Sequence, residues 1–292
     1  MSPRPAPKRT GRATTPRRGA APAGRGAAPG ARTRAGAPAT RRAAADGLGG
    51  EQVEGRQAVL ELLRAQRRRI NKIYMADALE PSAILDAIED LARRQRVPVQ
   101  LVSRARLDRD AQTEGHQGVY AEAAKLKDED LEELLAVKHP FLLVADGVTD
   151  PRNLGAILRS ADGAGVTGVV LPRHRSARIS PSVTKTAAGA VEYLRFAQVG
   201  GIPAALDRLN KAGVLTVGLA GEATQNLYDL DLASTPVALV VGGEENGLGQ
   251  LTRRRCAAVV SIPQLGKVSS LNAGVAASVA AFEVARQRAA RG

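Results

Sequence analysis

Three glycine-rich junctions in the second half of the chain carry the residues that could do chemistry. The first spans residues 146–155 (DGVTDPRNLG) and leads towards Arg159. Pro151 cannot continue a strand, and Asn153 is suited to capping the helix that follows. Arg159 lies six residues after Asn153, less than two helical turns away, so its guanidinium can project near the same end. Taken alone, this junction indicates a capped helix with a solvated arginine.

The other two junctions carry a glutamate and a serine. Residues 242–249 (GGEENGLG) follow an apolar run and hold Glu244, and their glycines permit close approach of the backbone to a ligand. This spacing is neither the dinucleotide-binding G-x-G-x-x-G pattern nor a phosphate loop with Lys-Ser/Thr. Residues 262–272 place Ser270 just before an alanine-rich helix, where a serine is more often an N-cap than a catalytic group. Each junction alone favours an ordinary loop.

The elements around these junctions predict an α/β fold. Continuous apolar runs, typical of strands buried on both faces of a sheet, occupy residues 141–145, 214–220 and 236–241. Shorter strands are predicted over residues 168–171 and 257–262, and helices over residues 153–164, 202–211 and 272–288. This alternation indicates a mostly parallel sheet with helices on both faces.

A smaller α/β domain is predicted over residues 51–124. The spacing of apolar residues indicates strands at residues 70–76, 97–102 and 118–124, and helices at residues 58–68, 82–96 and 105–111. The acidic stretch that follows predicts a linker helix over residues 125–139. The larger α/β domain then covers residues 140–292.

Positive charge is concentrated at the start of the chain. The protein has 292 residues and a formal charge of +13, yet residues 1–50 hold 11 Lys and Arg against a single acid, which leaves only +3 for the rest. Leu48 is the one leucine of this segment, which has no Ile, Val or Phe and is therefore predicted to be a disordered tail. Its arginines could contact RNA phosphates in a salt-sensitive way, and a solubilising extension is the alternative.

Composition excludes several classes of protein. A single cysteine, Cys256, cannot form an internal disulfide and favours a reducing compartment, here the cytoplasm. No stretch approaches 18 consecutive apolar residues, so we expect no membrane span. His139 and His174 have no partners at the spacing of metal ligands, so we predict no metal site.

Together the three junctions resemble the signature motifs of the SpoU (TrmH-type) branch of the SPOUT RNA ribose 2′-O-methyltransferases. The matching residues are Asn153, Gly155 and Arg159 in the first junction, Gly242, Glu244 and Gly247 in the second, and Ser270-Leu271-Asn272 in the third. Glu245-Asn246 replaces the commoner Gly-Glu, so the family glutamate is placed at Glu244. The resemblance implies a trefoil-knotted C-terminal domain, S-adenosylmethionine bound in the knot, and a homodimer formed through this domain.

The same resemblance implies roles for individual residues. The backbone around three residues would hold the cofactor: Gly242, Ile262 and Leu271. The reacting centre would be lined by Asn153, Arg159, Glu244, Ser270 and Asn272. Because a guanidinium rarely loses its proton, we expect Arg159 to grip the target phosphate and stabilise the developing alkoxide, instead of or before acting as a base.

Three short segments of the smaller domain extend the resemblance: Gly55-x-Gln57-Ala58-Val59, Leu107-Asp108 and residues 116–119 (HQGV). They are similar to the RNA-binding domain of RlmB-type 23S rRNA guanosine 2′-O-methyltransferases. The resemblance implies S-adenosylmethionine-dependent methylation of the ribose 2′-hydroxyl of a guanosine in 23S rRNA.

Rival hypotheses stay open at this point. Two are enzymes: a tRNA ribose 2′-O-methyltransferase, and a resistance-type enzyme that modifies a different rRNA nucleotide. A third is a non-catalytic RNA-binding ribosome-assembly factor with the same fold. A dehydrogenase-like nucleotide binder is disfavoured because the dinucleotide fingerprint is absent.

Overall fold

The computed structural model describes residues 47–268 and 270–291. Residues 1–46, which make up most of the predicted tail, lie outside the described residues. The next four residues belong to the folded part of the chain rather than to the tail. Leu48 is buried there, and the Gly50 N–H donates to the Ile179 carbonyl oxygen at 2.8 Å.

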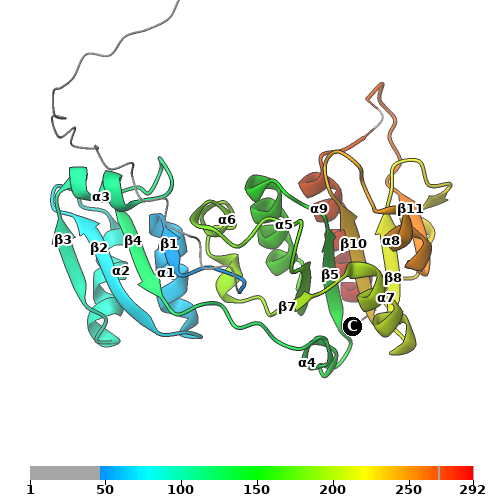
Figure 1. Ribbon diagram of the computed structural model, residues 1–292, viewed down its shortest axis with the longest axis horizontal. Coiled ribbons are helices and arrows are strands. Elements are labelled where there is room, and N and C mark those ends of the chain that lie inside the picture. The colour runs from blue at the N-terminus through cyan, green and yellow to red at the C-terminus, as the bar shows by residue number, and fades with distance from the viewer. Residues whose placement is uncertain (1–46, 269, 292) are drawn as a thin grey trace, which may run out of the picture. The chain divides into compact units, whose positions relative to one another are not determined.

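A four-stranded mixed sheet forms the smaller domain (Figure 1). Its strands are β1 (Gln52–Glu54), β2 (Ile70–Ala76), β3 (Val99–Val102) and β4 (Val119–Ala123), in the spatial order β1-β4-β2-β3. β4 runs antiparallel to β1 and β2, whereas β2 and β3 are parallel. The sequence pattern does not predict β1, because a strand of three residues is too short for a period to show.

Helices pack against both faces of this sheet: α1 (Arg56–Ala65) and α2 (Ala83–Arg94) on one, and α3 (Arg104–Asp110) on the other. Ile73 of β2 contributes to the core beneath α1 and α2. Its neighbour Tyr74 points to the opposite face and stacks on Tyr120, with ring centroids 4.6 Å apart, next to Leu107 of α3. Alternation along the strand therefore lets β2 contribute to two separate cores.

A buried ion pair joins Arg68, just after α1, to Glu192. Arg68 Nη2 lies 2.6 Å from Glu192 Oε1, and Arg68 Nε lies 2.8 Å from Glu192 Oε2. The two side chains are only 7% and 1% exposed. Arg68 Nη1 also donates to the carbonyl oxygens of Gly50 at 2.6 Å and Ala124 at 2.5 Å. The guanidinium is therefore satisfied from several directions, as burial of a charge requires.

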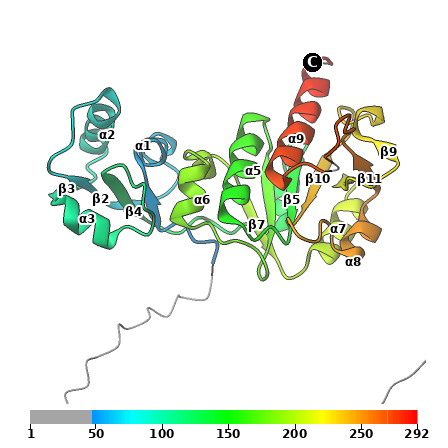
Figure 2. The same cartoon turned by 90° about the horizontal axis from the view of Figure 1, so that it is seen from above.

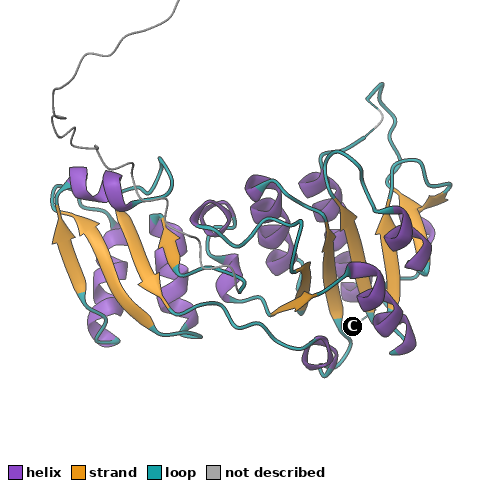
Figure 3. Cartoon of the chain, viewed as in Figure 1, coloured by secondary structure: helices purple, strands orange, loops and turns teal. Residues whose placement is uncertain are grey.

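The larger domain contains a seven-stranded sheet whose neighbouring strands all pair in parallel (Figure 3). The spatial order is β7-β6-β5-β10-β8-β11-β9. The strands are β5 (Phe141–Asp146), β6 (Gly168–Pro172), β7 (Phe196–Val199), β8 (Leu215–Leu219), β9 (Gln225–Asn226), β10 (Val237–Gly242) and β11 (Ala258–Ser261). The predicted fold class, an α/β protein with a mostly parallel sheet, is confirmed.

Helices cover both faces of this sheet, as predicted. One face packs against α5 (Pro151–Gly163), α6 (Pro181–Thr186) and α9 (Ala273–Ala289), and the other against α4 (Leu131–Leu135), α7 (Ile202–Lys211) and α8 (Gln250–Arg255). Figure 2 shows α5 and α9 lying side by side. Two short 3-10 helices complete the domain: η1 (Ala190–Glu192) and η2 (Leu227–Asp229). No helix in the described ranges is long and apolar enough to cross a membrane.

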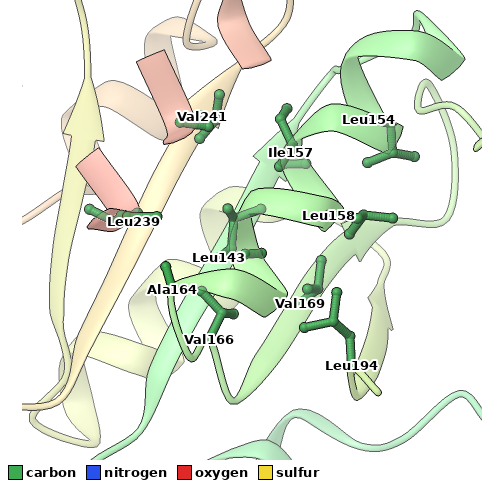
Figure 4. Packing of buried hydrophobic residues seen from close by; sticks show 14 of the residues in the cluster. Leu143, Leu154, Ile157, Leu158, Ala164, Val166, Val169, Leu194, Leu239 and Val241 are labelled. Atoms are coloured by element: carbon green, nitrogen blue, oxygen red, sulfur yellow. The ribbon is translucent and has the colours of Figure 1, made fainter. Parts of the chain in front are cut away.

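Burial on both faces explains the continuous apolar runs of the sequence. In β5, Leu143 joins the cluster that contains Ile157 and Leu158 of α5 (Figure 4). Its neighbours Leu142 and Val144 join the other cluster, which contains residues of α7. A strand placed in this way needs apolar side chains at successive positions rather than at alternate ones.

The linker helix predicted over residues 125–139 is wrong outside α4. Residues before α4 pair with β7 instead: Asp128 forms a β-bridge with Phe196, and the Glu129 N–H donates to the Phe196 carbonyl oxygen at 2.8 Å. The Glu129 carboxylate also accepts from Arg195 Nε at 2.8 Å. Pairing with β7 and this ion pair stabilise the acidic segment in an extended conformation. These tertiary contacts override its helical propensity. The trefoil knot implied by the resemblance stays a prediction.

Candidate active site

The first two junctions leave the sheet side by side. β5 and β10 are parallel neighbours, and Gly242 at the end of β10 is in register with Asp146 at the end of β5. Asp146 ties the two loops together, because its carbonyl oxygen accepts from the Gly243 N–H and its Oδ2 accepts from the Gly249 N–H, both at 2.9 Å. Since the carboxyl ends of parallel strands lie at one edge of a sheet, all three junctions open at this edge.

Close backbone contacts require glycine at two positions of the second junction. A Cβ atom on Gly242 would lie 2.1 Å from the carbonyl carbon of Gly247, and one on Gly243 would lie 2.2 Å from the carbonyl oxygen of Gly147. Both distances are far shorter than a van der Waals contact, so no larger residue fits without moving the backbone. The loop therefore presents peptide N–H and C=O groups at this point rather than side chains.

Hydrogen bonds join one side chain from each junction. Asn272 Nδ2 donates to Asn153 Oδ1 at 2.9 Å, and Asn153 Nδ2 donates to Glu244 Oε1 at 2.6 Å. We call the chain Asn272–Asn153–Glu244 the asparagine relay. Its members are far apart in the sequence, and the meeting of β5, β10 and the start of α9 at one edge brings them into contact.

The N-terminus of α9 sets the direction of the asparagine relay. Asn272 is the N-cap of α9, and its Oδ1 accepts from the backbone N–H groups of Gly274 at 2.9 Å and Val275 at 3.3 Å. Its Nδ2 must therefore point at Asn153, which in turn directs its own Nδ2 at Glu244. The donors of the relay all point towards Glu244, and the carboxylate is its final acceptor.

A cavity of about 650 Å³ opens beside the asparagine relay. Its lining includes five of the predicted site residues: Gly242, Glu244, Ile262, Ser270 and Leu271. This volume lies within the range of cofactor and small-molecule sites. Asn153 and Asn272 are joined to the cavity wall through Glu244. Among residues 47–268 and 270–291, no three His, Cys, Asp or Glu side chains gather where they could hold a metal ion.

Arg159 lies on the same helix as Asn153. It is exposed on α5 and does not line the cavity. Its predicted grip on a phosphate stays a prediction.

Two capping predictions are wrong. The N-cap of α5 is Asp150, not Asn153, and its carboxylate accepts from the Arg152 N–H at 2.8 Å. Pro151 occupies the first helical position, where its fixed φ suits a helix start, so the helix begins two residues earlier than expected. Likewise, Asn272 rather than Ser270 caps α9. Asn153 therefore lies within the first turn of α5, and its side chain is available to the asparagine relay.

Two charged residues of the cavity lie outside the three junctions. Glu222 follows β8, Arg253 lies on α8, and their side chains form an ion pair. A hydrogen bond from its own backbone, and then the Arg253 guanidinium, hold the pKa of Glu222 below its usual range. The buried apolar run at residues 214–220 was the available signal, because a residue just beyond a parallel strand lies at the binding edge.

Two family models match this chain. The SpoU rRNA Methylase family matches residues 140–282, and RNA 2′-O ribose methyltransferase substrate binding matches residues 52–129. The 23S rRNA (guanosine-2′-O-)-methyltransferase RlmB of Pectobacterium atrosepticum is 40% identical over 242 residues, which cover 82% of this chain and 98% of that protein. The chain belongs to the SpoU rRNA methylase family. The RlmB of Pseudomonas putida is 42% identical over 245 residues, covering 82% of this chain and 97% of its own.

Solved structures share the SpoU fold over both domains. The SpoU methyltransferase AviRb from Streptomyces viridochromogenes, in complex with AdoMet, aligns with a TM-score of 0.69 at 23% identity over 82% of this chain and 90% of its own. A structure described as an RNA 2′-O ribose methyltransferase aligns with a TM-score of 0.68 at 27% identity, covering 82% of this chain and 88% of its own. The family resemblance drawn from the three junctions and the smaller domain is confirmed.

Proposed function

We propose that this SpoU family member methylates the ribose 2′-hydroxyl of a guanosine in 23S rRNA with S-adenosylmethionine as the methyl donor. The asparagine relay is the observation that carries this proposal, because it joins all three junctions at the wall of a cavity large enough for a cofactor. Relatives named as 23S rRNA guanosine 2′-O-methyltransferases align over nearly their whole length, including the substrate-binding domain.

The cavity suits the nucleoside part of S-adenosylmethionine. Gly242, Ile262 and Leu271 all line it, and Gly242 leaves peptide groups rather than a side chain exposed to a ligand. Backbone N–H and C=O groups at strand ends are well suited to the edges of an adenosine. When bound, the cofactor supplies a methyl group on a sulfonium centre.

The residues around the cavity would orient the ribose and help to remove the proton of its 2′-hydroxyl. Glu244 Oε1 is occupied by Asn153, which leaves Oε2 to accept a hydrogen bond from the 2′-hydroxyl and to take its proton as the 2′-oxygen is methylated. Ser270 lines the same cavity and could hydrogen-bond the substrate. Arg159, on the exposed side of α5, would bind the target phosphate and stabilise the alkoxide that forms at the 2′-oxygen.

Two further features belong to this proposal. We propose a homodimer formed through the larger domain, supported by Val275 and Phe282, which are 47% and 50% exposed on α9. We also propose that the protein acts in the cytoplasm, where bacterial relatives of this kind would meet newly made rRNA. Size-exclusion chromatography with light scattering would test the dimer, and a monomer at micromolar concentration would contradict it.

Mapping of 2′-O-methyl groups tests the function directly. We expect one guanosine of 23S rRNA to lose its ribose methyl group when the gene is deleted, and to regain it when purified protein and S-adenosylmethionine are added. If the missing methyl group lay in tRNA or at a different rRNA nucleotide, the proposed substrate would be wrong, but ribose 2′-O-methylation would still be the reaction. Unchanged methylation in both RNA pools would overturn the enzyme hypothesis in favour of a non-catalytic RNA-binding factor.

A further inference from the structure

An ion pair lines the cavity beside β8, whereas Glu244 of the asparagine relay lines it after β10. Arg253 lies on α8 and Glu222 in the loop after β8, so two separate elements bring opposite charges together at the cavity wall. β8 lies next to β10 in the sheet, on the opposite side of it from β5 (Figure 1). The pair is thus one strand further from β5, which leads into the helix that carries Asn153.

The structural contribution of this ion pair is small. The side chains of Arg253 and Glu222 are 40% and 68% exposed. An ion pair at such exposure adds little to stability, because water solvates both charges well when they are apart. Neither side chain belongs to the asparagine relay, and the proposed methyl transfer does not use them. A ligand with its own two charges could therefore separate the pair at little cost.

No second cationic side chain lines the cavity among the described residues. Only three charged residues line it among those that the structure describes, namely Glu222, Glu244 and Arg253, so Arg253 is the single cation. Glu244 is already bound by Asn153 at 2.6 Å. A negatively charged group of a ligand in this cavity would find one cationic side chain, and a positively charged group would find Glu222 beside it.

We propose that Glu222 and Arg253 separate to bind the two charges of the aminoacyl end of S-adenosylmethionine. Arg253 binds the α-carboxylate, since a guanidinium presents parallel N–H donors that match the two oxygens of a carboxylate. Glu222 binds the α-ammonium group. This assignment rests on the proposed function, and it adds a binding role for residues that the three junctions do not contain.

Two ligands distinguish the contribution of the charged aminoacyl end to binding from that of the nucleoside. S-adenosylhomocysteine contains both, whereas 5′-methylthioadenosine keeps the nucleoside and the sulfur but lacks the aminoacyl end. We expect Arg253→Gln to weaken S-adenosylhomocysteine about ten- to a hundredfold, as expected for a hydrogen-bonded charged pair, and to leave 5′-methylthioadenosine within about twofold. Isothermal titration calorimetry gives both affinities without requiring turnover. Arg254→Gln is the matched control, because Arg254 is exposed on the same helix and does not line the cavity.

A third ligand tests Glu222 separately. The deaminated analogue of S-adenosylhomocysteine keeps the carboxylate but lacks the ammonium group. Glu222→Gln should weaken S-adenosylhomocysteine about tenfold and leave the deaminated analogue unchanged, whereas Arg253→Gln should weaken both. Thermal melting of each variant checks that the fold is intact, and a small change is expected because the pair is exposed.

The outcomes distinguish this assignment from the proposed function. Equal weakening of S-adenosylhomocysteine and 5′-methylthioadenosine by either variant would overturn the assignment, because the residue would then act on the nucleoside or on the shape of the cavity. No weakening of S-adenosylhomocysteine would overturn it as well. If the unaltered protein bound neither nucleoside, the proposed cofactor itself would fail, and the assignment with it.

Discussion

Asn272 offers a way to separate the stability of α9 from the chemistry of the site. Its Oδ1 caps the helix while its Nδ2 starts the asparagine relay, so one side chain serves both roles through different atoms. Asn272→Asp keeps an acceptor oxygen for the backbone N–H groups and replaces the amide donor by a second carboxylate oxygen. Asn272→Ala removes both.

The two variants should therefore differ in stability, and both should lose activity. Asp and Asn are similar N-caps, so Asn272→Asp should change the free energy of unfolding by less than about 0.5 kcal/mol. Loss of the cap in Asn272→Ala should cost about 1 kcal/mol, which corresponds to about 2–4 °C in Tm for a protein of this size. Differential scanning calorimetry measures this contrast.

The effect on activity follows from the direction of the relay. The new carboxylate oxygen would face Asn153 Oδ1, now 2.9 Å from the Asn272 amide, so the Asn153 amide must turn over and donate to it. Asn153 would then present its oxygen to Glu244 and lose a hydrogen bond to a charged acceptor. This bond is exposed in the free protein, so water replaces it there and its loss costs little stability. Once substrate covers the site, the loss of a hydrogen bond to a charged acceptor costs about 1.5–3 kcal/mol, so single-turnover methyl transfer should slow about ten- to a hundredfold.

Rapid-quench measurement of methyl transfer to a 23S rRNA fragment gives this rate. Asn272→Asp should be at least as slow as Asn272→Ala, which removes the donor without turning the Asn153 amide over, and it should melt like the unaltered protein. If Asn272→Asp kept its rate within about twofold, the relay would not orient Glu244 for the reaction. If it melted like Asn272→Ala, the cap and the relay could not be separated in the way that the geometry implies.

Three other perturbations have defined outcomes. Gly242→Ala should abolish binding of S-adenosylhomocysteine by calorimetry, because its Cβ would lie 2.1 Å from the carbonyl carbon of Gly247; retained affinity would contradict the close packing of the loop. Arg68→Met should lower the free energy of unfolding in urea by about 3–5 kcal/mol, because it leaves Glu192 buried and unpaired, and adding Glu192→Gln should recover part of the loss. Burial raises the pKa of Cys256 to about 11, so the one thiol should react with an aryl disulfide at pH 7 on the order of 100-fold more slowly than free cysteine, and a free-cysteine rate would show that it is accessible.

Elements with a strong apolar period could be predicted from the sequence almost to the residue. The strand predicted over residues 70–76 is β2, and the helix predicted over residues 202–211 is α7. Elements decided by tertiary contacts could not. The segment before α4 is extended because it pairs with β7, a strand that was itself not predicted.

In the site, too, some features could be predicted from the sequence and others depended on tertiary contacts. Gly242, Glu244, Ile262, Ser270 and Leu271, all predicted from the junctions, do line one cavity. Asn153, Glu244 and Asn272 were expected to line the reacting centre, but the hydrogen bonds that join them were not predicted, and the first junction taken alone indicated that Asn153 caps its own helix. Asp150 and Asn153 are both good N-cap residues, and Pro151 between them favours the earlier start. Glu222 and Arg253 were missed because neither belongs to a junction rich in glycine.

The parallel order of the larger sheet also leaves a part of the protein free for engineering. Every junction that lines the cavity lies at the carboxyl edge, so the loops at the opposite edge only connect helices to strands. Ala212 and Gly213, between α7 and β8, are exposed there, and because Gly213 has a φ of +78° that favours glycine, Ala212 is the position to change. A fluorophore or affinity tag at this turn would lie about 16 Å from the binding edge, the length of the five-residue strand β8. The protein could thus be labelled or tethered for single-molecule work on RNA while its cavity stays unaltered.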